Sequence, residues 1–180
     1  MKQLMPLHQH SGITLIEIMI GVCILSILLH FTVFQMSEVL ARVRAENNTA
    51  LLHRGLYLSR LYAIEHNTFT TFCAMKNKRC VLDQWDKQVV VFTDKKNFGV
   101  RDPNEEILMV FDLAHQADRL KYPRRMITFR PDGTPNALNN GTFIYCPNYQ
   151  QAKLAGYAVT LSQTGRARVK STKECQSASL

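Results

Sequence analysis

A long apolar run near the N-terminus constrains the fold of this chain most strongly. From Ile13 to Phe34 the sequence reads ITLIEIMIGVCILSILLHFTVF and holds one formal charge, Glu17, together with the titratable His30. A helix of about 20 apolar residues is long enough to cross a bilayer, so the run predicts a transmembrane helix over residues 13–34. An unpaired carboxylate in hydrocarbon costs roughly 2.5–3.5 kcal/mol. We therefore expect Glu17 to have a partner.

The residues around this run resemble the class III signal of type IV pilins and pseudopilins. The matching stretch is SGITLIEIMIGVCILSILL. The resemblance implies that a prepilin peptidase cuts after Gly12, removes residues 1–12 as a leader, and leaves Ile13 as an N-methylated N-terminus. It also implies that Glu17, the fifth residue after the cut, meets the N-terminal amine of a neighbouring pilin during assembly. A plain signal anchor with an incidental glutamate is the alternative.

A second helical segment is expected to follow the apolar run. No proline occurs from Ser37 to about His66, and charged residues appear there. Residues 35–67 are therefore predicted to continue the same helix outside the membrane, with one side packed on a globular domain. The apolar side chains fall mostly at helical intervals: Leu40, Val43, Ala50, Leu51, Leu58, Leu61 and Ile64.

Residues 68–180 have the pattern of a β-rich domain. Short runs rich in Val, Ile, Thr and aromatic residues alternate with turn signals. The expected strands are Thr68–Ala74, Gln88–Thr93, Ile107–Phe111, Met126–Arg130, Gly141–Cys146, Gly156–Leu161 and Arg166–Lys170. A helical pattern occurs only over Ala114–Leu120. The predicted class is α+β, a long N-terminal helix docked on an antiparallel all-β domain, which is the lollipop arrangement of pilins.

Four of the five cysteines lie beyond the apolar run, and Cys23 within it is expected to pack as a small hydrophobic residue. An even set in a domain outside a membrane indicates disulfides and an oxidising compartment. Three pairings are possible, and we favour Cys73–Cys80 as a local loop and Cys146–Cys175 as a clamp on the C-terminus. A zinc site is the rival interpretation, but the sequence has no C-x-x-C pair.

The order of motifs resembles the FimT/GspH branch of minor pilins over nearly the whole chain. The motifs are Trp85, Val91-Phe92-Thr93-Asp94, Asp102-Pro103-Asn104-Glu105, Ile127-Thr128-Phe129-Arg130-Pro131-Asp132-Gly133, Gly141-Thr142-Phe143 and Gly165-Arg166-Ala167-Arg168-Val169. The chain departs from the family at Gln88, where a glycine is common. In FimT-type pilins the Gly-Arg-x-Arg motif is associated with DNA capture during natural transformation, and the resemblance assigns that role to Arg166 and Arg168.

The charge distribution agrees with a polyanionic partner. The net charge is +8, and residues 119–173 hold ten Lys or Arg against the single acid Asp132. Alternation along a strand would place Arg166, Arg168 and Lys170 on one face at intervals of about 7 Å, with Ala167 and Val169 pointing inward. Lys173 and Lys153 are added as candidates from charge alone. A solvated basic face is the alternative, as is a motif that only docks the pilin on its neighbours.

The sequence offers little for other function classes. H-E-x-x-H, G-x-S-x-G, C-x-x-C and P-loop patterns are missing. The stretch Asp94–Glu105 resembles a calcium loop, but Lys96 and Phe98 stand at ligand positions, and Glu105-Glu106 is interpreted as a solvated turn. We expect no enzyme activity, no cofactor and no metal. The predicted protein is an inner-membrane prepilin with a periplasmic domain, later carried in a pilus, that binds DNA without sequence preference. An assembly-only minor pilin or secretion pseudopilin is the alternative.

Overall fold

The structure is a computed structural model that describes residues 13–112, 118–148 and 156–177. The side chains of residues 31–35, 37, 176 and 177 are not described. The expected leader with Gly12, and the candidate Lys153, lie outside the described residues. The chain forms two compact units, residues 1–37 and 38–180.

Helix α1, Leu15–Glu65, starts in the first unit. Thr14 precedes it, and the Glu17 amide donates to the Thr14 carbonyl at 3.1 Å and to Thr14 Oγ1 at 3.4 Å. Threonine before the helix with glutamate three residues later is the arrangement of a capping box. Glu17 therefore also occupies the glutamate position of that box, in the first turn of α1. The sequence predicts a membrane span over residues 13–34, whereas no helix among the described residues is both long and apolar enough to cross a bilayer.

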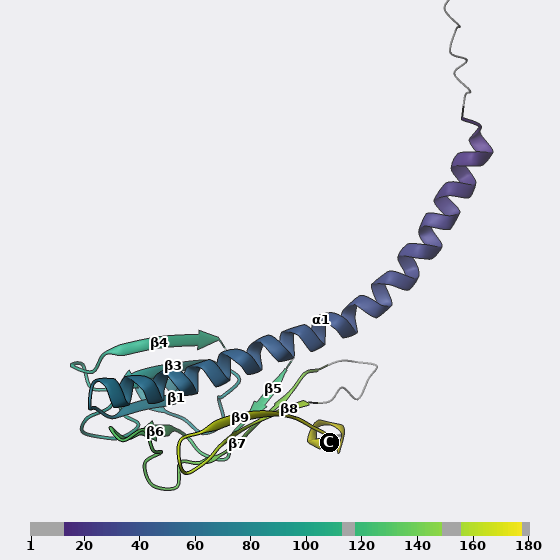
Figure 1. Cartoon of the computed structure of the whole chain (residues 1–180). Coiled ribbons are helices and arrows are strands. Elements are labelled where there is room, and N and C mark those ends of the chain that lie inside the picture. The colour runs from purple at the N-terminus through teal and green to yellow at the C-terminus, as the bar shows by residue number, and fades with distance from the viewer. Residues whose placement is uncertain (1–12, 113–117, 149–155, 178–180) are drawn as a thin grey trace, which may run out of the picture. The chain divides into compact units, whose positions relative to one another are not determined.

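The second unit contains two antiparallel sheets (Figure 1). The first has the order β2-β1-β3-β4, with β6 paired to β1. Its strands are β1 Thr70–Lys76, β2 Arg79–Cys80, β3 Gln88–Thr93, β4 Ile107–Asp112 and β6 Ile127–Phe129. The second has the order β5-β7-β8-β9. Its strands are β5 Arg119–Lys121, β7 Gly141–Cys146, β8 Gly156–Leu161 and β9 Ala167–Thr172. The short helix α2, Glu174–Ser177, follows β9.

The expected α+β class, a helix packed on antiparallel sheet, is confirmed. Strands β3, β7 and β8 have the predicted bounds, and the other predicted strands shift by one or more residues. Strands β2 and β5 were not predicted. The helix expected over Ala114–Leu120 is wrong at its C-terminal end, because Arg119 and Leu120 belong to β5. Residues 113–117 of that stretch lie outside the described part.

The face of α1 that packs on the sheets differs from the predicted one. Of the residues predicted to face the domain, Leu40 and Val43 are more than half exposed, and Leu61 and Ile64 are also exposed. The buried stripe consists mainly of small side chains: Ala41, Ala45, Thr49, Leu52, Gly55, Leu56, Ser59 and Ala63. A Cβ at Gly55 would lie 2.8 Å from the Phe72 ring. Small residues let the helix backbone approach the sheet closely, and a search for large apolar residues misses them.

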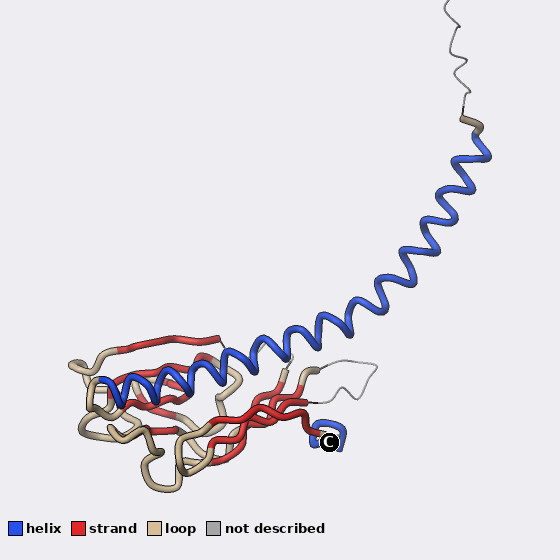
Figure 2. The backbone as a smooth tube through the Cα atoms, in the orientation of Figure 1, coloured by secondary structure: helices blue, strands red, loops and turns tan. Residues whose placement is uncertain are grey.

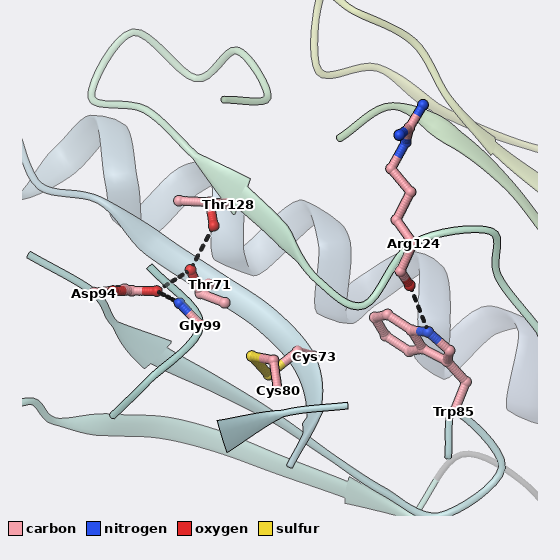
Figure 3. The surroundings of a disulfide bond; sticks show 8 residues. All are labelled: Thr71, Cys73, Cys80, Trp85, Asp94, Gly99, Arg124 and Thr128. Carbon is pink, nitrogen blue, oxygen red and sulfur yellow. Dashed lines mark hydrogen bonds between the residues drawn. A yellow bond between two sulfur atoms is a disulfide. The ribbon is translucent and has the colours of Figure 1, made fainter. Parts of the chain in front are cut away.

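Aromatic side chains fill the space between the two sheets and α1. Phe72, Trp85, Tyr122 and Phe143 contact one another with ring centroids 3.9–6.4 Å apart. Figure 3 shows the Trp85 indole donating to the Arg124 carbonyl at 2.9 Å. The buried apolar residues of the described chain all lie between Ala41 and Leu161. A fragment of residues 38–180 therefore retains the whole core.

Polar residues are buried on the other face of the first sheet, beside the Cys73–Cys80 disulfide (Figure 3). Asp94 Oδ2 accepts from Thr71 Oγ1 at 2.6 Å and from the Gly99 amide at 2.8 Å. Burial raises the pKa of Asp94, and these two hydrogen bonds oppose the rise. Glu105 was expected in a solvated turn, but it is buried, and its carboxylate accepts from the amides of Lys95 and Asp102. Asp94 Oδ2 and both carboxylate oxygens of Glu105 are therefore used within the protein.

Both favoured disulfides are present, so the predicted pairing is confirmed. Cys73 is bonded to Cys80 across β1 and β2, and Cys146 in β7 is bonded to Cys175 in α2. The second bond ties α2 to the C-terminal end of β7, an inner strand of the second sheet. Gly156 is required beside it, because a Cβ there would lie 2.1 Å from Cys175 Sγ.

Removal of the Cys146–Cys175 bond is expected to lower stability substantially. The bond closes a loop with a sequence separation of 29 residues, for which chain entropy predicts a stabilisation of about 3–4 kcal/mol. Urea unfolding of residues 38–180 should show a loss of this size in Cys146→Ser/Cys175→Ser. A loss below about 1 kcal/mol would contradict a stabilising role for the clamp.

Candidate nucleic-acid interface

The Gly-Arg-x-Arg motif begins in a tight turn that leads into β9. The Ser162 amide donates to the Arg166 carbonyl at 3.0 Å, and the Arg166 amide donates to Ser162 Oγ at 3.1 Å. Gly165 has φ +78°, a conformation that glycine adopts without strain. A Cβ there would lie 2.2 Å from the carbonyl oxygen of Gly133. That oxygen also accepts from Arg60 Nε at 3.0 Å, so the turn packs directly against the loop that α1 holds.

Strand β9 is an edge strand with an exposed basic side. Its register places Arg168 opposite Thr160 and Lys170 opposite Ala158 of β8. Arg166, Arg168 and Lys170 are exposed, as is Lys173 before α2. The prediction of a strand beginning at Arg166 is off by one residue. Ala167 packs against the core, but Val169, also expected inward, is 43% exposed. Because β9 is the last strand of its sheet, its inner face is only partly covered.

The opposite edge of the same sheet carries two cations that are not among the predicted site residues. Arg119 and Lys121 of β5 are exposed, whereas Leu120 between them is buried. The register runs without a break from Lys121 to Ile144 of β7, Ala158 of β8 and Lys170 of β9. Directly paired residues in antiparallel strands point to the same face. Lys121 and Lys170 therefore stand at the two edges of one face. In the sequence, the alternation of charged and apolar residues in Arg119-Leu120-Lys121 is the pattern that indicates a strand with both cations on one exposed face.

The inner face of this sheet is fixed to α1 by polar contacts. Tyr145 of β7 accepts from Asn48 at 2.8 Å, and Tyr157 of β8 donates to Glu46 at 2.9 Å. The face that carries Lys121 and Lys170 is therefore the outer one, turned away from the helix. Strands β5, β7, β8 and β9 contain no acidic residue. We call this surface the basic outer face: Arg119, Lys121, Thr142, Ile144, Ala158, Thr160, Arg168 and Lys170.

Asp118 anchors the start of β5. Its side chain is 0% exposed and accepts two hydrogen bonds from the Arg44 guanidinium at 2.8 and 2.9 Å. It also accepts from Tyr145 at 2.5 Å and from the Asn148 amide at 2.9 Å. Burial acts to raise the pKa of Asp118, but the hydrogen bonds from Arg44, Tyr145 and Asn148 outweigh it and hold the pKa below its ordinary value. The carboxylate is thus ionised at neutral pH and fully paired.

A cavity of about 500 Å³ lies beside the free edge of β5. Its lining includes Arg119 and Lys121 together with Asp83 and Asp86. The two acids reduce the positive potential at this edge compared with β9. Among the described residues, no three His, Cys, Asp or Glu side chains are placed to hold a metal ion.

Comparison with known proteins decides the family. The profile described as Type II transport protein GspH matches residues 48–165, which is most of the chain. The chain belongs to the GspH family. No curated protein matches the sequence of this GspH-family chain.

Solved structures similar to this GspH-family protein include a type IV minor pilin and a minor pseudopilin. The type IV minor pilin FimU of Pseudomonas aeruginosa is 20% identical, with a TM-score of 0.57 over 74% of this chain and 96% of FimU. The minor pseudopilin EpsH of the Type 2 Secretion System of Vibrio cholerae is 14% identical, with a TM-score of 0.50 over 71% of this chain and 97% of EpsH. These likenesses establish the shared fold. The chain is thus a member of the GspH family with the fold of a type IV minor pilin and a minor pseudopilin.

Proposed function

We propose that this minor pilin binds DNA without sequence preference through the basic outer face, for DNA uptake in natural transformation. The observation that supports the proposal is the placement of the Gly-Arg-x-Arg motif. The turn at Gly165 packs closely against the Gly133 carbonyl oxygen, and Arg166 and Arg168 are exposed beyond it. No carboxylate on the four strands competes for these guanidinium groups. Arginine offers a planar fork of donors that matches phosphate.

Lys170 extends the line of charge along β9, and Lys173 follows the strand just before α2. Both are included in the proposed site. Lys153 belongs to the proposal from sequence alone. Contacts to phosphate carry no base information, so binding is expected to be independent of sequence. A site with about three phosphate contacts should bind weakly, on the order of micromolar or worse at physiological salt. Several subunits in one fibre would then act together.

The proposal also covers the processing of the chain, its anchoring in the membrane and its assembly with other pilins. The prepilin peptidase would cut between Gly12 and Ile13 and leave a chain anchored in the inner membrane, with residues 38–180 in the periplasm and later at the pilus. Glu17 would pair with the N-terminal amine of an adjacent pilin. A buried ion is stable only with such a partner, so the pairing would select the correct register. Both disulfides agree with an oxidising compartment.

The test compares two variants that each lose two positive charges, one in the Gly-Arg-x-Arg motif and one on the other sheet. Arg166→Gln/Arg168→Gln should weaken binding to random duplexes about tenfold or more at roughly 50 mM salt, because two phosphate contacts are lost. Lys76→Gln/Arg79→Gln removes two exposed cations from β1 and β2 of the other sheet and should change the affinity less than twofold. Fluorescence anisotropy with two unrelated duplexes measures both. Equal losses of DNA affinity in the two variants would show that binding depends on net charge and not on the motif, which would contradict the proposal.

An assembly-only role is the second candidate. It is favoured by the family match and by the likeness to EpsH, a pseudopilin of a secretion system. If the intact protein and Arg166→Gln/Arg168→Gln bind DNA equally weakly, while the variant no longer associates with other pilins, the assembly role replaces the proposed one.

A further inference from the structure

The two edges of the basic outer face carry two separate lines of cations. One line follows β9 and its preceding turn, with Arg166, Arg168 and Lys170. The other consists of Arg119 and Lys121 on β5. Strands β7 and β8 lie between them. Figure 2 draws the strands of the domain in red beside the blue helix α1. Neighbouring strands are about 4.8 Å apart, so three strand spacings separate the two lines by about 14 Å.

The space between Lys121 and Lys170 is neutral and shallow. Next to it, at the Arg119 end of the same face, Cys175 of α2 lies against Cys146 of β7 and Gly156 of β8. The outward residues of β7 and β8 in this region are Thr142, Ile144, Ala158 and Thr160, and Thr142 and Thr160 hydrogen-bond to each other at 3.1 Å. None of them is long or charged. A rod with negative charge on two parallel tracks can therefore lie over the part of the sheet that α2 leaves open, from Lys121 and Lys170 toward Thr142 and Thr160, while each track contacts one line of cations.

We propose that the site takes double-stranded DNA and holds both phosphate backbones at once, with β5 contacting one strand and β9 the other. The inference rests on the proposed function and names its substrate class. The separation of about 14 Å is comparable with the width of the major groove, about 12 Å, and the long Arg and Lys side chains cover the difference. A single strand has one phosphate track and can follow only one line of cations.

The contribution of β5 is the smaller one. Asp83 and Asp86 line the cavity beside Arg119 and Lys121, and their charge opposes a phosphate there. The β9 line has no acid beside it on the sheet and includes two arginines. Loss of the β5 pair should therefore reduce duplex affinity about fivefold, and loss of the Arg166 and Arg168 pair should reduce it more.

The test uses the full chain purified in a neutral detergent, with a 30-base-pair random duplex and a 30-nucleotide oligothymidine as probes. Arg119→Gln/Lys121→Gln should weaken duplex binding about fivefold and change oligothymidine binding less than twofold. The duplex log–log salt slope should fall by about 2, since each phosphate contact contributes about 0.9. The charge-retaining variant Arg119→Lys/Lys121→Arg should bind the duplex within twofold of the parent. This variant separates a loss of charge from a loss of fold.

Three outcomes overturn the proposal that β5 and β9 each contact one phosphate backbone of the duplex. They are an unchanged duplex affinity in Arg119→Gln/Lys121→Gln, an equal loss on both probes, and a loss in the charge-retaining variant as large as in the glutamine variant. In each case the proposed function survives if Arg166→Gln/Arg168→Gln still weakens binding. If Arg166→Gln/Arg168→Gln changes binding to neither probe, the proposed function is wrong. The proposal that β5 and β9 each contact one backbone is then wrong as well.

Discussion

Replacing Arg44 by alanine is expected to lower the free energy of unfolding by about 3 kcal/mol. The guanidinium donates two hydrogen bonds to Asp118, whose side chain is completely buried. Breaking a buried ion pair leaves the remaining charge unpaired, which typically costs 3–5 kcal/mol. Arg44 is itself 29% exposed, so the lower end of that range applies. Urea unfolding of residues 38–180 measures the loss.

The control is Arg42→Ala, two residues away on the same helix. Arg42 pairs with Glu38 at 3.5 Å on an exposed surface, and such pairs contribute little, about 0–1 kcal/mol. The pH dependence gives an independent check. The pKa of Asp118 is lowered in the folded protein, so its pairing stabilises the fold above the ordinary carboxyl pKa of about 4 and is lost as the pH falls further. The gap between Arg44→Ala and the parent should shrink below about pH 4. A gap that is constant with pH would contradict the account.

Gly165→Ala is expected to be comparably harmful, at about 3 kcal/mol. Alanine at φ +78° costs about 1–2 kcal/mol in backbone strain, and its Cβ would lie 2.2 Å from the Gly133 carbonyl oxygen. A backbone atom cannot move away as a side chain can. Thermal unfolding of residues 38–180 should show the loss, while Thr164→Ala in the same exposed turn should stay within about 0.5 kcal/mol of the parent.

This pair of variants separates the roles within the motif. Gly165 shapes the turn, and Arg166 and Arg168 are free to bind. The double arginine variant should therefore lose DNA affinity without losing stability, whereas Gly165→Ala should lose stability first. If Gly165→Ala were as stable as the parent, the close packing of the turn on Gly133 would be wrong.

The sheet strands could be predicted from sequence where pattern and burial agree. Strands β3, β7 and β8 combine β-branched or aromatic residues with clear turn signals, and their bounds were predicted correctly. Strand β5 was missed because three residues are too short to show a period, and their pairing with β7 is decided by tertiary contacts. The buried face of α1 was missed for a different reason: Ala45, Gly55 and Ser59 are buried because they are small, which hydrophobicity does not register.

The candidate site was predicted along one edge of its sheet only. The Gly-Arg-x-Arg motif is local in sequence, so Arg166, Arg168 and Lys170 could be grouped before the fold was known. Arg119 and Lys121 join the same face only through the register β5-β7-β8-β9, which brings together residues about 50 positions apart in the sequence. The Arg44–Asp118 pair also joins distant segments of the chain, and no local sequence pattern predicts it.

The salt dependence of duplex binding tests the central claim most directly. The affinity of a random duplex is measured for the intact protein and for Arg166→Gln/Arg168→Gln between about 50 and 200 mM salt. The predicted log–log slope is about −3 or steeper for the intact protein, and it becomes shallower by about 2 in the variant. An identical slope in both proteins would show that the motif does not touch phosphate, and the proposed function would be wrong.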